Sequence, residues 1–257
     1  MTLEAVIFDV DGTLADTEEA HRQAFNATFR DFCLPWEWDA PLYRNLLAVT
    51  GGKERMRHYC ERFHPDFLAI PEADEFIARM HKAKTVRYGQ MVMRGGVAAR
   101  PGVVRLIREL RAAGIRLAIA TTTSRSNVDA LLATTLQALP PDTFEGIGAA
   151  EQAADKKPSP AIYRWVLERL ALSPDECIAI EDSRNGVQAA QAAGIPTLVT
   201  ECGWTAGENF SGALAVLSDL GEPDRPYVAI GGAAVDAGCV DPELLRHWHA
   251  QTTPPTA

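Results

Sequence analysis

Cysteine is scarce in this chain, and the few cysteines present form no recognisable pattern. The 257 residues include five, an odd number, widely spaced and without a C-x-x-C pair. A structural zinc site needs thiolates or imidazoles at short spacing, and a disulfide framework needs an even set in a small secreted domain. The sequence therefore argues against both and is typical of a protein of the reducing cytosol.

Blocks of positive charge and long apolar runs are also missing. The formal net charge is -9, with 25 Lys and Arg against 34 Asp and Glu. Nucleic-acid binding and polybasic membrane patches both need clustered cations, and no apolar run reaches membrane-spanning length. The first apolar run begins at Leu3, which leaves no room for a signal or transit peptide. We expect a cytoplasmic protein without nucleic-acid or membrane partners.

That first apolar run, residues 3–8, is typical of a buried β-strand and ends in two carboxylates, Asp9 and Asp11. Side chains two positions apart on a strand share a face, and parallel α/β sheets bind ligands outside the carboxyl ends of their strands. Adjacent carboxylates repel each other unless a cation or a shared proton relieves them. Mg²⁺ prefers such oxygen ligands together with water and phosphate. An acidic turn is the alternative, since Asp and Gly favour turns.

The remaining chain divides by its periodicity. Residues 16–96 carry apolar residues at helical spacing, interrupted by proline and paired glycine, without a run typical of a strand. Strands and helices then alternate, which predicts an α/β fold, a Rossmann-like, doubly wound parallel sheet with helices on both faces. We assign 1–15 and 97–225 to a discontinuous catalytic core, 16–96 to an inserted α-helical cap domain, and 226–257 to a C-terminal extension, partly disordered at its end.

The same patterns predict individual elements. Helices are expected in the insert at 20–29, 40–47, 53–63 and 72–93, and in the core at 103–113, 126–136, 160–171 and 185–193. Strands are expected at 115–120, 144–149, 176–182, 196–200 and 214–217. The extension has a candidate strand at 227–230 and a helix at 242–249, and residues 252–257 are expected to fray.

Polar residues follow later core strands at the points where a ligand site is expected. The hydroxyl run Thr121–Ser124 follows one strand, Lys157 stands directly before a proline, and Glu181 and Asp182 close another strand. Each motif alone is weak, because hydroxyl runs often cap helices and loop lysines are ordinarily solvated. In this order the motifs resemble those of the haloacid dehalogenase superfamily of phosphotransferases.

That resemblance implies roles for residues of each motif. Asp9 would be the nucleophile that becomes an aspartyl phosphate, and Asp11 the general acid/base. Mg²⁺ would be bound by Asp9, the backbone carbonyl of Asp11 and Asp182, with Glu181 as a ligand through water. The transferring phosphate would be held by Thr121, Thr122 and Lys157, and Lys156 is left to solvent.

The insert narrows the resemblance to the CbbY subgroup, sugar-phosphate phosphatases associated with the Calvin cycle. The likeness is carried by residues 15–26, 50–55 and 121–124 and extends over about residues 3–222. It implies hydrolysis of xylulose 1,5-bisphosphate, an inhibitor of Rubisco, to xylulose 5-phosphate. The partner would be this small phosphorylated sugar, with a functional link to Rubisco and no implied direct contact.

A bisphosphate needs a second cationic pocket away from the metal, and the insert offers candidates. Solvated positions on charged helices are the alternative for each cation, and an ordinary polar contact is the alternative for His21. The predicted substrate-binding residues are Glu18, His21, Lys53, Arg55, His81, Lys84 and Thr123.

Three other functions stay open. A β-phosphoglucomutase would share the insert and all four motifs, and a phosphoglycolate phosphatase would need no second phosphate pocket. A catalytically silent binding module is the remaining option. Retention of Asp9, Asp11, Lys157 and Asp182 argues against it.

Overall fold

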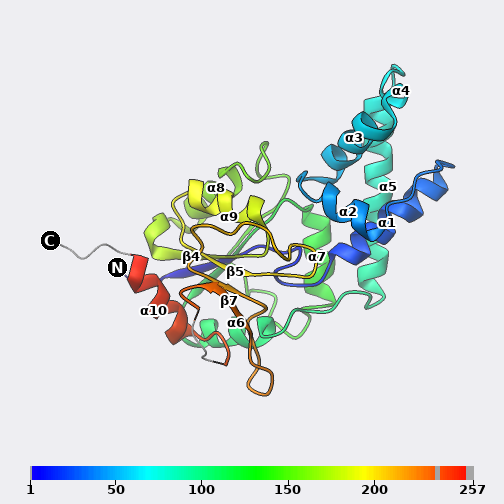
Figure 1. The fold of residues 1–257 in the computed structure, drawn as a ribbon. Coiled ribbons are helices and arrows are strands. Elements are labelled where there is room, and N and C mark those ends of the chain that lie inside the picture. Colours follow the sequence, from blue (N-terminus) through cyan, green and yellow to red (C-terminus); the bar gives the residue numbers. More distant parts are fainter. Residues whose placement is uncertain (1, 235–237, 253–257) are drawn as a thin grey trace.

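A computed structural model describes residues 2–234 and 238–252, which form a sheet covered by helices and a helical projection to one side (Figure 1). The seven strands lie in the order β3-β2-β1-β4-β5-β6-β7. Their bounds are β1 Ala5–Phe8, β2 Arg116–Ala120, β3 Gly146–Gly148, β4 Cys177–Glu181, β5 Thr197–Thr200, β6 Ala215–Leu217 and β7 Ala229–Gly232. No helix in the described ranges is sufficiently long and apolar to span a bilayer.

The sheet is parallel from β3 to β6, whereas β7 pairs antiparallel with β6. The parallel sheet predicted for the core is therefore confirmed from β3 to β6, and β7 adds an antiparallel strand at one edge. The chain returns directly from β6 to β7 without a crossover helix, and parallel pairing would need one. The predicted strand at 227–230 lies two residues further along the chain than expected.

Alternating residues of β1 pack into two hydrophobic layers, one on each face of the sheet, because successive side chains of a strand point to opposite faces. Val6 and Phe8 pack into one layer, Ala5 and Ile7 into the other. The first layer includes side chains of α6 (Val103–Ala112), α7 (Arg125–Ala133) and α10 (Pro242–Thr252). The second is covered by α8 (Ala161–Leu170) and α9 (Arg184–Ala192), with a short 3₁₀ turn at Pro174–Glu176 before β4. The doubly wound core predicted from the sequence is confirmed.

The chain between β1 and β2 is helical and has a hydrophobic cluster of its own. Phe25, Phe29, Trp36 and Trp38 pack within it in tilted and edge-to-face arrangements. Its helices are α1 Glu18–Asp31, α2 Ala40–Leu46, α3 Gly52–Phe63, α4 Pro65–Leu68 and α5 Ala73–Met93. The single turn α4 was not expected from the sequence, since its four residues are too few to show a helical period.

The two connections between the sheet and this insert run side by side. Asp16 N donates to Ala98 O (3.1 Å), and Arg100 N donates to Leu14 O (3.1 Å). The side chain of Arg100 is buried and donates to Thr200 O (2.7 Å) and Ser218 O (2.6 Å) at the ends of β5 and β6. Both connections are thus tied to the edge of the sheet where the candidate residues lie.

The C-terminal extension completes the core. Strand β7 forms one edge of the sheet, and α10 packs against α6 with Leu245 and Trp248 buried in the larger hydrophobic layer. From the sequence, residues 252–257 are expected to fray, but Thr252 still belongs to α10, and residues 253–257 lie outside the described residues. The extension therefore supplies an additional edge strand to the sheet.

Candidate active site

One cavity of about 1530 Å³ lies between the carboxyl ends of the strands and the insert. Strands β1, β2 and β4 are neighbours in the sheet, so the residues that follow them are brought together at one edge. Every site residue predicted from the sequence lines this cavity except Glu181, which lies behind its wall. They are Asp9, Asp11, Glu18, His21, Lys53, Arg55, His81, Lys84, Thr121, Thr122, Thr123, Lys157 and Asp182.

Lys157 links two carboxylates at the floor of the cavity. Its Nζ lies 2.6 Å from Asp9 Oδ1 and 2.6 Å from Glu181 Oε1, and it also donates to Ala120 O (2.9 Å). Burial alone would lower the pKa of this amine, but the two carboxylates raise it above its usual value. Lys157 therefore remains a cation beside Asp9.

Asp9 is held by both backbone and side-chain contacts. Its N–H donates to Ile180 O (3.0 Å), which fixes the end of β1 against β4. Burial raises the pKa of its carboxyl group; Lys157 opposes that shift, while the charges of Glu181 and Asp11 add to it. The carboxylate is poorly solvated, which favours reaction with an electrophile only where cations hold it ionised.

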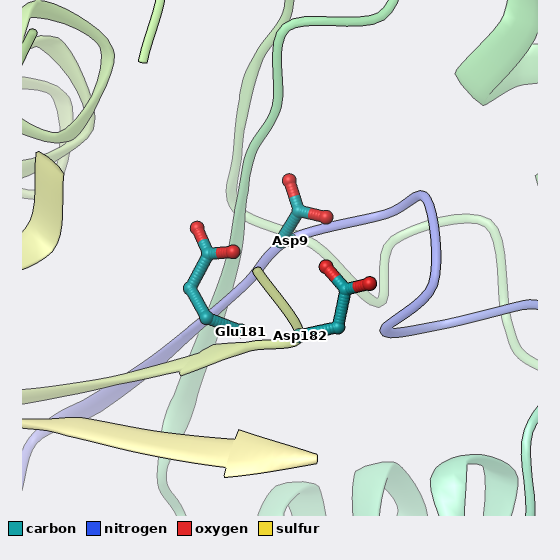
Figure 2. Close-up of side chains that lie close together, drawn as sticks. All are labelled: Asp9, Glu181 and Asp182. Carbon is teal, nitrogen blue, oxygen red and sulfur yellow. The ribbon is translucent and has the colours of Figure 1, made fainter. Parts of the chain in front are cut away.

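Asp9, Glu181 and Asp182 form an acidic cluster in which one carboxylate oxygen from each residue lies within 4.8 Å of the other two. Figure 2 shows the three carboxyl groups on the same side of the strand ends. Burial, then the charges of Asp9 and Glu181, raise the pKa of Asp182. Glu181 Oε1 accepts from Lys157 and Tyr163, but its buried Oε2 has no hydrogen-bond partner. Crowded carboxylates with an unpaired oxygen fit a hard cation such as Mg²⁺.

Gly12 makes room for Asp182 in this cluster. A Cβ at position 12 would lie 2.0 Å from Asp182 Oδ2, and the glycine has a φ of +80°. The same oxygen, Asp182 Oδ2, also lies 3.2 Å from Cys202 Sγ. Any side chain at position 12 would displace the Asp182 carboxylate, so the glycine of this motif is required by both space and conformation.

Asp11 points away from the acidic cluster and toward the insert. Its Oδ1 accepts from Thr17 Oγ1 (2.6 Å) and lies 3.0 Å from His21 Nε2. His21 Nδ1 lies 2.5 Å from Lys84 Nζ, and the imidazole stacks on Tyr88. Burial would raise the pKa of Asp11, yet His21 and Thr17 hold it at about 2.

The pKa values of His21 and Lys84 indicate the direction of these bonds. Burial, then the charge of Lys84, lowers the pKa of His21, while burial and Arg55 lower the pKa of Lys84 to about 7. A neutral imidazole has one donor and one acceptor nitrogen. We infer that Nε2–H donates to Asp11 and that Nδ1 accepts from Lys84.

Two hydroxyl groups of the run after β2 already accept hydrogen bonds from nearby groups of the protein. The buried Thr121 Oγ1 accepts from Thr123 N (3.2 Å), and Thr123 Oγ1 accepts from Asn127 Nδ2 (2.9 Å). Each hydroxyl still has its own proton to donate. Thr122 is half-buried and lines the cavity beside them.

The insert provides the opposite wall. Arg55 Nη1 donates to Tyr43 Oη (2.9 Å), whose hydroxyl donates to Glu18 Oε2 (2.6 Å). Burial, then the charges of Lys84, Lys156 and Lys53, lowers the pKa of His81 to about 4, so this imidazole is neutral near pH 7. The positive charge on this wall therefore comes from lysine and arginine.

Three contacts join the insert to the core, and two of them link residues that line the cavity. Lys156 Nζ lies 2.9 Å from Glu54 Oε2, so the expectation that Lys156 faces solvent is wrong. Asn185 Nδ2 donates to Thr50 Oγ1 (2.9 Å), and Arg44 Nη2 donates to Gly203 O (2.8 Å). Sequence reasoning missed these pairs because their partners are more than 100 positions apart in the chain.

Three functional candidates had no recognisable sequence signal. Tyr163 donates to Glu181, Cys202 contacts Asp182, and Tyr43 joins Glu18 to Arg55. Tyr43 and Tyr163 occupy ordinary apolar positions of amphipathic helices, where a tyrosine is expected in any core. Only the structure shows that their hydroxyls face site residues.

Comparison with known proteins agrees with this geometry. A family model of haloacid dehalogenase-like hydrolases matches residues 3–194. The plasmid-encoded CbbY protein of Cupriavidus necator is 50% identical over 251 residues, which cover 97% of this chain and 98% of that protein. The structure of a CbbY variant from Rhodobacter sphaeroides with xylulose-(1,5)bisphosphate is 43% identical, with a TM-score of 0.77, over 85% of this chain and 95% of that one. A β-phosphoglucomutase from Clostridium difficile shares the fold, with a TM-score of 0.73 and 20% identity over 98% of each chain.

Proposed function

This chain belongs to the haloacid dehalogenase-like hydrolases, and from that premise we propose that its substrate is xylulose 1,5-bisphosphate, hydrolysed to xylulose 5-phosphate with Mg²⁺. Its relatives make it a phosphatase of phosphorylated sugars. The observation that supports a bisphosphate is the charge arrangement of the cavity: Lys157 and the acidic cluster form its floor, and Lys53, Arg55 and Lys84 line the opposite wall.

The floor of the cavity suits phosphoryl transfer through a covalent intermediate. An oxygen of Asp9 attacks phosphorus in line, forming an Asp9–phosphorus bond as the bond to the sugar oxygen breaks. Lys157 offsets negative charge on the transferring group, and the hydroxyls of Thr121 and Thr122 donate to its oxygens. Water then cleaves the acyl phosphate, which releases inorganic phosphate and restores Asp9.

Asp11 is suited to move the protons of both steps. It gives a proton to the departing sugar oxygen and takes one from the water that attacks the intermediate. In the ligand-free protein its pKa is about 2, so it is ionised. Entry of a phosphate dianion raises the pKa of a neighbouring carboxyl group and promotes protonation. His21 holds the Asp11 carboxylate in place through both stages.

The acidic cluster fits a bound Mg²⁺. Asp9, Asp182 and the backbone carbonyl of Asp11 would hold the ion, with Glu181 behind them as a further acidic group. When bound, the ion supplies positive charge to the phosphoryl oxygens and to the Asp9 carboxylate. Asp182 would orient it, and the pKa of each ligating carboxyl group would fall.

We also propose the division into a core of residues 1–15 and 97–225, a cap of 16–96 and an extension of 226–257. The separate aromatic cluster of the insert supports this division. Binding of a small phosphorylated sugar, a cytoplasmic location and a functional rather than physical link to Rubisco complete the proposal. The cap would enclose the sugar and exclude water during phosphoryl transfer.

Phosphate release with Mg²⁺ tests the proposal directly. The substrates to compare are xylulose 1,5-bisphosphate, ribulose 1,5-bisphosphate, phosphoglycolate and β-glucose 1-phosphate, and Asp9→Asn is the inactive control. A clear preference for the first in kcat/KM, lost in Asp9→Asn, supports the proposal. Isomerisation of β-glucose 1-phosphate without release from either bisphosphate would identify a mutase and overturn it.

A further inference from the structure

Tyr43 is a fully buried residue of α2 that joins two side chains of the cavity wall without reaching the cavity itself. Its hydroxyl donates to Glu18 Oε2 (2.6 Å) and accepts from Arg55 Nη1 (2.9 Å). The Arg55 guanidinium also lies over the ring, 5.2 Å from its centre. One phenol thus fixes an acid and a cation that both face the substrate space.

The direction of the two hydrogen bonds follows from the charges. A carboxylate can only accept and a guanidinium can only donate, so the hydroxyl must donate to Glu18 and accept from Arg55. Burial, then the charge of Glu18, raises the pKa of Tyr43, which keeps its proton. The two hydrogen bonds therefore run in only one direction: Arg55 donates to Tyr43, and Tyr43 donates to Glu18.

The ring of Tyr43 is anchored at the contact between insert and core. It packs beside Trp38 in the aromatic cluster of the insert and meets Trp204 edge-to-face, with ring centres 5.5 Å apart. Trp204 belongs to the loop after β5, where Gly203 O accepts from Arg44. The ring of Tyr43 is therefore held in place by contacts with both the insert and the core.

We propose that Tyr43 is a positioning residue for sugar recognition, which holds Glu18 toward the sugar hydroxyls and Arg55 toward the distal phosphate at a fixed separation. This inference rests on the proposed function and extends it to a residue that does not touch the substrate. Without the hydroxyl, Glu18 and Arg55 would keep their charges but lose their common partner, and their side chains would sample more rotamers.

Tyr59 offers a matched comparison within the same aromatic cluster. It is also buried, and its hydroxyl contacts His64 Nε2 (3.1 Å), but neither residue lines the cavity. Tyr43→Phe and Tyr59→Phe each remove one oxygen and retain the ring. A difference between them in substrate recognition reports the role of the Tyr43 hydroxyl rather than packing.

The test compares two substrates for each variant. Xylulose 1,5-bisphosphate needs both wall residues, whereas p-nitrophenyl phosphate has neither sugar hydroxyls nor a second phosphate. In Tyr43→Phe we expect KM for the bisphosphate to rise about tenfold, the order expected for one charge-assisted hydrogen bond, with kcat for p-nitrophenyl phosphate unchanged. Tyr59→Phe should leave both substrates unchanged. The inference would be overturned if Tyr43→Phe lowered kcat/KM equally for both substrates, or if it left KM for the bisphosphate unchanged.

A double-mutant cycle with Glu18→Gln adds a second criterion. If Tyr43 acts through Glu18, the double variant loses less kcat/KM than the product of the two single losses; independent losses contradict the inference.

If the wild-type protein cleaves p-nitrophenyl phosphate but not the bisphosphate, the proposed function fails separately from this inference. The cycle is then measured with the sugar phosphate that the wild type prefers. Calorimetry with the Asp9→Asn variant, with and without Tyr43→Phe, makes the same comparison as a ratio of Kd values for the substrate.

Discussion

The ammonium of Lys157 lies 2.6 Å from the carboxylate of Asp9, although the two residues are 148 positions apart in the chain. Both are buried, and the lysine is held on its other side by Glu181. Coulomb attraction between buried charges is screened much less than at the surface. Lys157 is therefore the protein group best placed to keep Asp9 ionised.

Replacing Lys157 with glutamine should move the acid limb of the pH–rate profile. Burial raises the pKa of Asp9 and Lys157 lowers it, so removal of the ammonium raises that pKa further. In the proposed mechanism Asp9 attacks as the carboxylate, so the fall of kcat/KM in acid should begin at a higher pH than in the wild type. We also expect kcat to drop roughly 10²- to 10³-fold, as when a group that stabilises transition-state charge is lost.

The measurement is kcat/KM against pH at saturating Mg²⁺, with Lys156→Gln as the control. That substitution removes the neighbouring charge without touching Asp9. An unshifted acid limb in Lys157→Gln would mean that Lys157 does not control the ionisation of Asp9.

Stabilisation by Mg²⁺ should grow with pH. The pKa values of Asp9 and Asp182 are raised in the folded protein. The favourable contribution of these groups to stability is present below the unfolded pKa and is lost as pH rises through the folded pKa. Mg²⁺ competes with protons for the same oxygens. The increase in Tm on adding Mg²⁺ should therefore be larger at about pH 7.5 than at about pH 5.

Asp182→Asn is the matched variant for this prediction, because it keeps the size of the side chain and removes its charge. It should lose most of the Mg²⁺-dependent increase in Tm, while its ligand-free Tm at neutral pH should rise, since one buried like charge is gone. A Tm increase that is independent of pH, or intact in Asp182→Asn, would speak against the assigned cation site.

Much of the floor of the site could be predicted because its signal is local. Asp9, Asp11 and Asp182 follow apolar strands, and the strand order places those ends together. A strand is predicted near β7, at 227–230, but neither its bounds nor its antiparallel pairing follows from the sequence. The residues of β7, Ala229–Gly232, are mostly exposed, so they carry no alternation of buried and solvated positions.

The wall of the site depends on how the insert packs against the core, which no local pattern records. Glu54 and Lys156 look like ordinary surface charges in the sequence, yet they pair between the insert and the core. Tyr43 looks like a core residue, and it is one, but its hydroxyl contacts Glu18. Such contacts depend on how each helix is rotated about its own axis, and not only on where the helix begins and ends.

Removing the charge of Lys53 should weaken binding of a bisphosphate selectively. Lys53 is exposed at the first turn of α3 and lines the cavity; within the described residues no ion pair engages it. A solvent-screened contact with phosphate is worth about 1 kcal/mol. We expect Lys53→Ala to raise KM for xylulose 1,5-bisphosphate roughly threefold to tenfold, with KM for phosphoglycolate unchanged.

Arg62→Ala, at the other end of α3, removes the same charge at a residue outside the cavity lining. It controls for the net charge of the insert. If the two variants raise KM equally, or if Lys53→Ala affects both substrates alike, Lys53 is not part of a distal phosphate pocket.

Two of the contacts between the insert and the core should respond differently to salt. Lys156 and Glu54 form an ion pair whose side chains are 22% and 44% exposed, whereas Asn185 donates to Thr50 without a charge on either group. If both hold the cap closed over the substrate, Lys156→Ala and Asn185→Ala should each raise KM for the bisphosphate, by about 1.5- to fivefold for a contact of this exposure.

Salt then separates the two contributions. At an ionic strength near 1 M the screening length is about 3 Å, so the ion pair contributes little in the wild type and KM of Lys156→Ala should approach the wild-type value. The increase caused by Asn185→Ala should persist, because a neutral hydrogen bond is not screened. Arg57→Ala breaks an exposed pair with Asp74 inside the insert and should change KM at neither ionic strength. If Lys156→Ala keeps its full effect in salt, Lys156 acts by another route, such as direct contact with the substrate, and the ion pair does not hold the cap closed.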